Sequence, residues 1–175
     1  DKKPGGEGGR VSVAEILEVL QDGSAEDASR AMLEGLEQGV PEQQLWTAVF
    51  LAAGDLMLKQ SGIISVHANT SVNALHYAYR HVGHPGTRRQ ILLQAAAFLP
   101  LFRDLLGVER RDLRIDTVEV LEQGQDSGSA LVDIFETVSV DRVEAARKTL
   151  GYLGAGGAEL PFMNLARQYV VDRNT

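Results

Sequence analysis

Apolar residues recur three and four positions apart along most of the chain, which is the spacing of one face of an α-helix. The first such stripe consists of Val13, Ile16, Leu17 and Leu20. Ser12 stands directly before this stripe and Glu15 follows three residues later, which is the arrangement of a capping box at a helix start. Gly23 comes after the stripe, and we expect it to end the helix in the left-handed backbone conformation.

The same spacing predicts further helices, separated by glycine, serine and proline residues. Their expected ranges are 24–39, 41–60, 68–82, 87–106, 130–138, 141–153 and 158–172, with a short helix at 118–122. The link 63–66 reads as extended, and Pro100 is expected to kink or split its helix. No run of residues alternates as a strand would, so the predicted fold class is all-α, a helical bundle or array.

One helix is expected to lie at the centre of this bundle. It begins at Pro41, whose missing N–H suits the first position of a helix. From Trp46 to Leu58 it is apolar on nearly every side, and a helix without a polar face is normally buried. We therefore expect the helix over 68–82 to pack against it.

Composition divides the chain into four parts. Residues 1–10 are rich in glycine and lack apolar periodicity, as a flexible tail does. Residues 11–122 form a first helical unit that contains a histidine-rich helix. The polar segment 123–129 reads as a linker, and residues 130–175 read as a partial second repeat that continues in a longer protein.

The two ends of the chain resemble each other. Residues 15–18 (EILE) match residues 133–136 (DIFE) at an offset of 118, and Asp55 falls opposite Asp172 at an offset of 117. At that second offset, four residues near the N-terminus have identical counterparts: Ala28, Arg30, Leu33 and Leu36 match Ala145, Arg147, Leu150 and Leu153. The pattern predicts an internal duplication of a three-helix unit, although amphipathic helices also resemble one another without common origin.

Charge and composition exclude several function classes. The 175 residues carry a net charge of −7, so no basic surface for nucleic acid is expected. The chain has no cysteine, which excludes disulfides, thiolate metal sites and cysteine nucleophiles. The longest apolar stretch, residues 45–58, is interrupted by polar residues and is too short for a membrane span.

Polar side chains capable of chemistry concentrate in one window. It holds all four histidines of the chain, His67, His76, His81 and His84. A histidine in an apolar helical environment stays neutral near pH 7, so it can relay a proton or hold a polar ligand atom. We select His67 and His76 as candidate catalytic residues. The candidate ligand-binding residues in this window are Asn73, Tyr77 and Arg80, of which the last two can orient an anionic or phenolic oxygen.

Asp55 adds a carboxylate to the ligand-binding candidates. It lies four residues before Lys59, the spacing of an ion pair on a helix, so it is either a partly exposed pair or a buried carboxylate facing the histidine helix. Metal-binding histidines on a helix usually lie three or four residues apart, which His67 and His76 do not. We therefore predict no metal ligands, while a single axial histidine to haem stays open and the cofactor is unknown.

The histidine window resembles part of a known family. The stretch SVHANTSVNALHYAYRHV, a short glycine–proline turn and then TRRQILLQAAAFLP resemble the questin oxidase-like family, which is helical. The matching positions are His67, His76, Arg80 and the helix from Arg88, within about 35 residues of the chain. The resemblance implies an oxidative enzyme that acts on an aromatic or polyketide-like substrate.

Two functional hypotheses follow from the sequence. The first is a helical domain that binds a small molecule or cofactor at the histidine-rich helix of an oxidative enzyme. The second is a non-catalytic helical-repeat module that binds a partner, either another subunit or the remainder of the same protein. No secretory signal is present, which favours the cytoplasm, although a chain that starts with Asp can also have a processed N-terminus.

Overall fold

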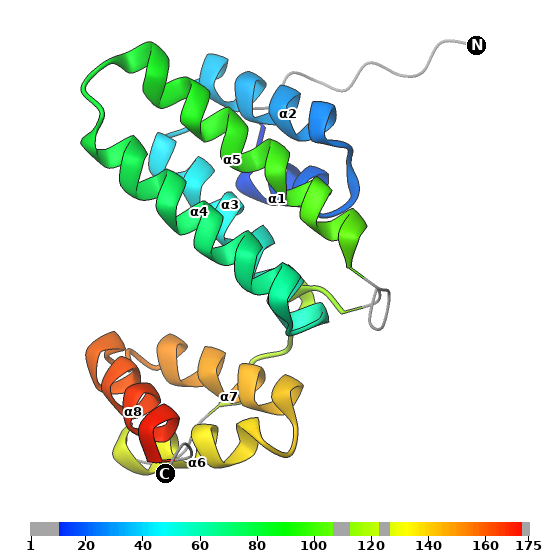
Figure 1. The fold of residues 1–175 in the computed structure, drawn as a ribbon. Helices are drawn as coiled ribbons and strands as arrows, with labels where there is room; N and C mark the ends of the chain where they lie inside the picture. Colours follow the sequence, from blue (N-terminus) through cyan, green and yellow to red (C-terminus); the bar gives the residue numbers. More distant parts are fainter. Residues whose placement is uncertain (1–10, 107–112, 123–126, 173–175) are drawn as a thin grey trace. The chain divides into compact units, whose positions relative to one another are not determined.

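The computed structural model describes residues 11–106, 113–122 and 127–172, and its regular elements there are all helical (Figure 1). The fold class is therefore all-α, and the helices pack as bundles. The α-helices are α1 (Val13–Asp22), α2 (Ala25–Glu37), α3 (Glu42–Lys59), α4 (Ile63–His81), α5 (Pro85–Leu105), α6 (Ser127–Val138), α7 (Arg142–Gly154) and α8 (Glu159–Asp172), and a 3-10 turn, η1, spans Ile115–Thr117.

The first two helices begin as the sequence predicts. The backbone N–H of Glu15 donates to the Ser12 hydroxyl, and the Glu15 carboxylate accepts the N–H of Ser12, which completes a capping box. Ser24 caps α2 through the same pair of bonds with Asp27. The expectation for Gly23 is wrong, because its φ of −77° lies in the extended region and not in the left-handed one.

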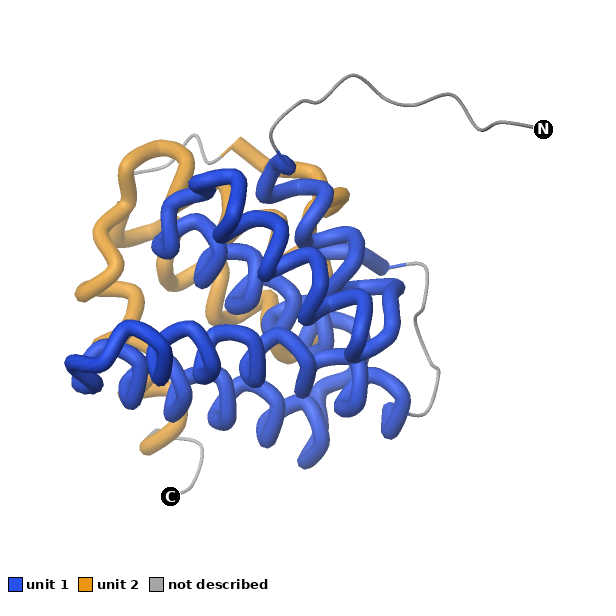
Figure 2. Tube along the Cα trace, turned by 90° about the horizontal axis from the view of Figure 1, so that it is seen from above, with its two compact units in different colours: residues 1–115 blue, residues 116–175 orange. Residues whose placement is uncertain are grey.

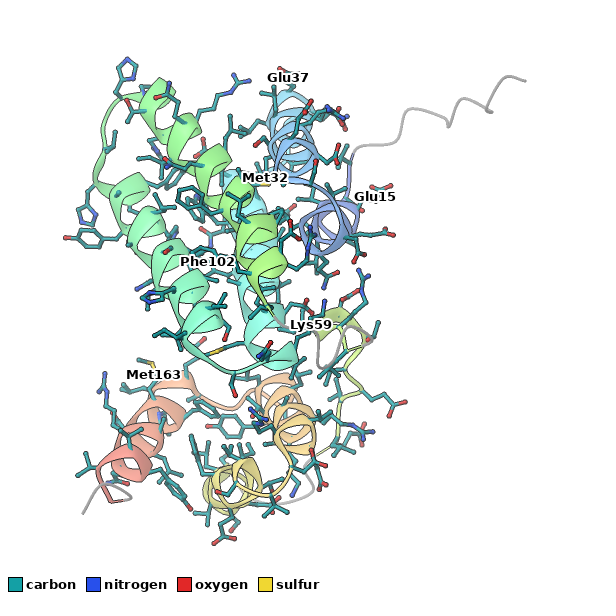
Figure 3. The ribbon with its side chains drawn as sticks, turned by 45° about the vertical axis from the view of Figure 1, so that its right-hand side comes forward. Glu15, Met32, Glu37, Lys59, Phe102 and Met163 are labelled. Carbon is teal, nitrogen blue, oxygen red and sulfur yellow. The ribbon has the colours of Figure 1, made fainter. Side chains whose placement is uncertain are left out.

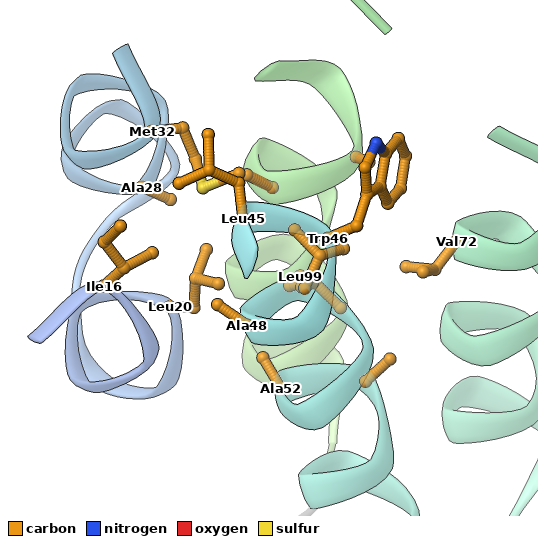
Figure 4. Packing of buried hydrophobic residues seen from close by; sticks show 14 of the residues in the cluster. Ile16, Leu20, Ala28, Met32, Leu45, Trp46, Ala48, Ala52, Val72 and Leu99 are labelled. Atoms are coloured by element: carbon orange, nitrogen blue, oxygen red, sulfur yellow. The ribbon is translucent and has the colours of Figure 1, made fainter. Parts of the chain in front are cut away.

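Helix α3 is the centre of the first bundle, as its apolar sequence predicts. It packs against α1 on one side and against α4 on the other, while α5 packs against α2 and α4. Figure 4 shows Leu45 projecting from α3 towards α1 and α2, and Trp46 projecting towards Val72 of α4. All three side chains are buried in one continuous apolar core.

Three local predictions are corrected. Residues 63–66 are helical and not extended, because the Ser65 hydroxyl accepts the N–H of Gly62 and donates to the carbonyl of Gln60, which starts α4 at Ile63. Helix α5 continues through Pro100, which is buried in the helix and does not divide it. Residues 118–122 are not helical, since the Leu121 N–H donates to the carbonyl of Arg147 in α7 instead of to its own segment.

The chain forms two compact units, residues 1–115 (unit 1) and residues 116–175 (unit 2) (Figure 2). Ile115 belongs to unit 1 and donates its N–H to Asp55 of α3, whereas Leu121, further along the chain, donates its N–H to the carbonyl of Arg147 in unit 2. Residues 127–129 of the expected linker begin α6, whereas the rest of that linker and the expected tail over 1–10 lie outside the described residues. Unit 2 has its own small core of Ala130, Leu131, Ile134 and Tyr152.

Candidate functional site

The predicted site residues on α4 point in different directions. His67, Asn73, Tyr77 and Arg80 are all exposed, whereas His76 is half-buried. His67 and His76 are separated by two and a half helical turns, so they lie on opposite sides of α4. The structure therefore does not bring the two candidate catalytic histidines to one site.

His76 lies in an aromatic cluster between α3 and α4. Its ring centroid is 4.7 Å from that of Trp46 and 5.1 Å from that of Phe50. Tyr79, one turn further along α4, also contacts Trp46, with ring centroids 5.1 Å apart. Edge and tilted contacts of this kind stabilise aromatic pairs beyond the area that they bury.

This environment disfavours the charged form of His76. Burial, and secondarily the positive charge of Arg80, lower the pKa of His76 below that of a free histidine. The imidazole is therefore neutral at pH 7 and keeps one donor and one acceptor nitrogen. The sequence-based expectation of a neutral histidine in an apolar surrounding applies to His76, whereas His67 is exposed.

A polar network adjoins the cluster and was not anticipated from the sequence. The Tyr79 hydroxyl donates to the carboxylate of Glu42, which also accepts from Arg88 of α5 at 3.2 Å. The Arg88 guanidinium lies over the Tyr79 ring, 4.4 Å from its centroid. Burial, together with the hydrogen bond to Glu42, raises the pKa of Tyr79, so this hydroxyl is a donor at neutral pH.

Two buried donors beside this cluster lack a hydrogen-bond partner among the described residues, the Nε–H of Arg88 and the indole N–H of Trp46. The indole N–H belongs to the aromatic cluster itself. It is buried and has no hydrogen-bond acceptor among the described residues. A buried donor left without an acceptor costs about 1–3 kcal/mol, so a polar atom placed beside it would be bound favourably. No sequence signal marks this atom, because Trp46 reads as an ordinary core residue.

The two remaining histidines have local structural roles. His81 donates from Nδ1 to the carbonyl of Tyr77 at 2.7 Å, and its ring stacks on the Tyr77 ring with centroids 4.0 Å apart. His84 caps α5, where its Nδ1 accepts the N–H of Thr87. Tyr77 is thus joined to His81 at the exposed end of α4 and not to Arg80.

Asp55 is buried, with 1% of its side chain exposed, and forms the predicted ion pair with Lys59 at 2.7 Å. Its other oxygen accepts the N–H of Ile115 at 2.8 Å. The carboxylate therefore holds the end of unit 1 against α3, and these two partners, Lys59 and Ile115, are not residues of the histidine helix. Figure 3 labels Lys59 at the end of α3.

The predicted residues on α4 line neither of the two hollows found among the described residues. Within the described part of the chain, no three His, Asp or Glu side chains are placed to hold a metal ion. An open hollow between α1 and α2 has a largely acidic lining, which includes Glu18, Asp22, Asp27 and Glu34. A second hollow lies along α6. No described helix combines the length and the hydrophobicity that crossing a membrane requires.

Helix α8 is apolar on two opposite sides. Phe162 and Leu165 pack on the core of unit 2. The opposite side carries four exposed apolar side chains, which we term the outer face of α8: Leu160, Met163, Val170 and Val171. Figure 3 labels Met163 on this helix. Asn164 and Arg167, which are also exposed, lie on the same side of the helix between the first two and the last two of these residues. Exposed apolar side chains grouped on one helix side, with polar residues beside them, are a common mark of an interaction surface.

Comparison of the chain with protein families, with curated proteins and with solved structures finds no match.

Proposed function

We propose that the protein is a non-catalytic helical-repeat module that packs within a larger assembly, and that it does so by binding an amphipathic helix of a partner polypeptide on the outer face of α8. The observation that carries this proposal is the exposure of Leu160 (63%), Met163 (48%) and Val170 (64%) on one side of a helix whose other side is packed. An apolar helix face is normally recognised by the apolar face of another helix.

The arrangement of the histidines supports the same proposal. Catalysis by paired histidines needs both rings at one reacting atom, whereas His67 and His76 lie on opposite sides of α4. His81 and His84 are engaged in local hydrogen bonds. A cytoplasmic location belongs to this proposal and is tested together with it, by fractionation of the cells used in the experiment below.

A second candidate function is favoured by one observation, the buried Trp46 N–H beside the neutral ring of His76. Under this candidate a small aromatic ligand with a polar atom binds between α3 and α4, which is compatible with the resemblance to questin oxidase-like proteins. The absorption spectrum of the purified chain and of the His76→Ala variant tests it. A chromophore bound to the first and lost from the second supports ligand binding, and a colourless chain argues for the docking module.

The docking proposal is tested with the tagged chain expressed in its own cells. Gel filtration should place the wild-type chain in an assembly larger than its own 19.0 kDa. Met163→Glu puts a charge into the docking face and should return the chain to its own size. Tyr77→Ser is the control, since Tyr77 is even more exposed than Met163 but lies outside the outer face of α8, and it should leave the assembly unchanged.

A wild-type chain that elutes at its own size, or an assembly that Met163→Glu leaves intact, overturns the proposal. Circular dichroism of the purified variant separates loss of binding from loss of folding. A substitution of an exposed residue ordinarily changes stability by no more than about 0.5 kcal/mol, so the variant should keep its helix content.

A further inference from the structure

Three structural features of α1–α3 recur in α6–α8 at a constant offset of 117 residues. Ser24 and Asp141 are the N-caps of the second helix in each set. Gly39 and Gly156, which follow those helices, are the two glycines with positive φ in the described chain, at 76° and 83°. The third helices begin at Glu42 and Glu159. Caps and left-handed glycines fix where helices start and stop, so a shared offset at all three is a structural correspondence.

The inner packing of the two sets corresponds as well. In unit 1, Gly35 of α2 lies against Leu45 of α3 and Ile16 of α1. The equivalent positions in unit 2 are Tyr152, Phe162 and Ile134, which pack together in the core of that unit. In both sets the third helix is therefore packed through the same side against the first two.

The opposite side of the third helix differs between the sets. In unit 1, Trp46 contacts His76 and Tyr79 of α4, and the carbonyl of Ala53 accepts from Asn69 of α4 at 2.8 Å. Trp46 and Ala53 are both at least 99% buried. Their equivalents in unit 2 are Met163 and Val170, which are 48% and 64% exposed. The positions that α4 covers in unit 1 are thus the positions left open on α8.

From this correspondence we infer that α6–α8 repeat α1–α3, and that the outer face of α8 receives an antiparallel helical hairpin of a partner segment in the place that α4 and α5 take in unit 1. The inference rests on the proposed function and names the occupant of its docking face.

The chemistry of the hairpin follows from α4 and α5. The buried side of α4 combines the small and β-branched residues Ser65, Ala68 and Val72, which allow close approach to α3, with the aromatic ring of Tyr79. Helix α5 packs on both α4 and α2. In unit 2 the counterpart of α2 is α7, where Leu153 is 45% exposed although its equivalent Leu36 packs on the core. The partner hairpin therefore covers α8 with one helix and reaches Leu153 of α7 with the other.

A hairpin fits this surface better than a second copy of the same helix does. A helix of 14 residues such as α8 is about 21 Å long. Two such helices crossing each other bury far less than the roughly 1,200 Å² that a stable interface needs. A hairpin that contacts both α7 and α8 covers a larger area, as α4 and α5 together do in unit 1.

The test uses single cysteines, which the cysteine-free chain makes unambiguous. Val170→Cys and Ala53→Cys are equivalent positions in the two sets, one open and one covered. In the full chain, maleimide should modify the first at least about tenfold faster than the second, because a covered thiol reacts only when its surroundings open. Slow modification of Val170→Cys at every protein concentration would mean that the face is already covered, which overturns the proposed function itself.

The second arm supplies a hairpin as the probe. A copy of residues 59–106, which contain α4 and α5, is fused after Thr175, because position 58 is the equivalent of 175 at the offset of 117. The fused hairpin should slow the modification of Val170→Cys about tenfold through the same protection by coverage. The matched control carries Ala68→Glu and Val72→Glu in the fused copy alone, and it should leave the thiol reactive.

Two results overturn the inference while leaving the proposed function standing. One is modification of Val170→Cys at the same rate with and without the fused hairpin. The other is protection of the unfused chain that rises with protein concentration, which would make a second copy the occupant. Circular dichroism and the unfolding midpoint of each variant show that the thiols are compared in folded proteins.

Discussion

His76 is the residue whose surroundings predict a measurable dependence on pH. Its pKa is lowered by burial and by Arg80, so the unfolded chain, with an ordinary histidine pKa of about 6.5, takes up a proton before the folded chain does. The state that binds more protons gains stability as pH falls, and here that is the unfolded state. His76 therefore destabilises the fold progressively below about pH 7.

The prediction is tested by urea unfolding of the wild-type chain and of His76→Gln between about pH 7.5 and 5.5, around the histidine pKa. The wild-type midpoint should fall more steeply with decreasing pH than that of the variant, since both share every other titrating group. His67→Gln is the control, and it should follow the wild type because His67 is exposed. Parallel curves for wild type and His76→Gln would contradict the assigned environment.

Some contacts of single residues could be predicted from the sequence, and others could not. The ion pair between Asp55 and Lys59 follows from a local spacing of four residues and is confirmed. The bond from the Ile115 N–H to the same carboxylate joins positions that no periodicity relates. The Tyr79–Glu42–Arg88 network is of the same kind, since its three members lie on three different helices. Contacts between distant elements depend on how the helices pack, which the sequence pattern leaves open.

At the scale of the elements, the turn after α2 offers a test of backbone conformation alone. Gly39 has a φ of 76°, and a Cβ added there would meet no atom within 4 Å. Gly62 is equally open but has an extended φ of 177°. Gly39→Ala should therefore destabilise the chain by about 1–2 kcal/mol, the cost of the left-handed region for a side chain.

Gly62→Ala is the matched control and should change stability by no more than about 0.5 kcal/mol, because an extended backbone suits any residue. Both free energies come from denaturant unfolding of the purified variants. Equal effects of the two substitutions would mean that the turn at Gly39 is not held in the left-handed conformation in solution.

Some sequence signals were sufficient to predict where the helices begin and continue, and others were not. The capping boxes at Ser12 and Ser24 specify helix starts through bonds within four residues, and the structure has both. The segment over 63–66 was wrongly predicted to be extended, because its β-branched residues favour strands while the Ser65 side chain and the packing of α4 decide the outcome. Pro100 was expected to break α5, yet the buried neighbour Leu99 and the proline itself pack in the core as part of one helix.

For the whole molecule, the helical period along the chain was enough to predict the all-α class, and the apolar helix α3 was correctly placed at the centre. The boundary between the units could not be predicted, since it depends on tertiary contacts such as those of Ile115 with Asp55 and of Leu121 with Arg147. The candidate site could be predicted only in part from the sequence, because it also depends on contacts between helices. Helical angles already place His67 and His76 on opposite sides, but only packing shows which of them faces Trp46.

The two cores differ in size, and this difference predicts an order of opening. The core of unit 1 includes Trp46, Ile16, Leu92 and Leu99 among many fully buried side chains, whereas the core cluster of unit 2 is much smaller in the part of the chain that the structure describes. A small unit with little buried apolar surface is only marginally stable, so its backbone amides exchange through low-energy opening. Hydrogen exchange measured by mass spectrometry on the full chain should therefore show α6–α8 exchanging before α1–α5.

Hydrogen exchange of the chain with the fused hairpin can be compared with that of the unfused chain. Covering α8 adds apolar burial to unit 2 and should slow exchange in α6–α8 while α1–α5 keep their rates, because binding to the folded state alone raises its stability. Simultaneous exchange of all eight helices in the unfused chain would show that the small core of unit 2 does not limit its stability.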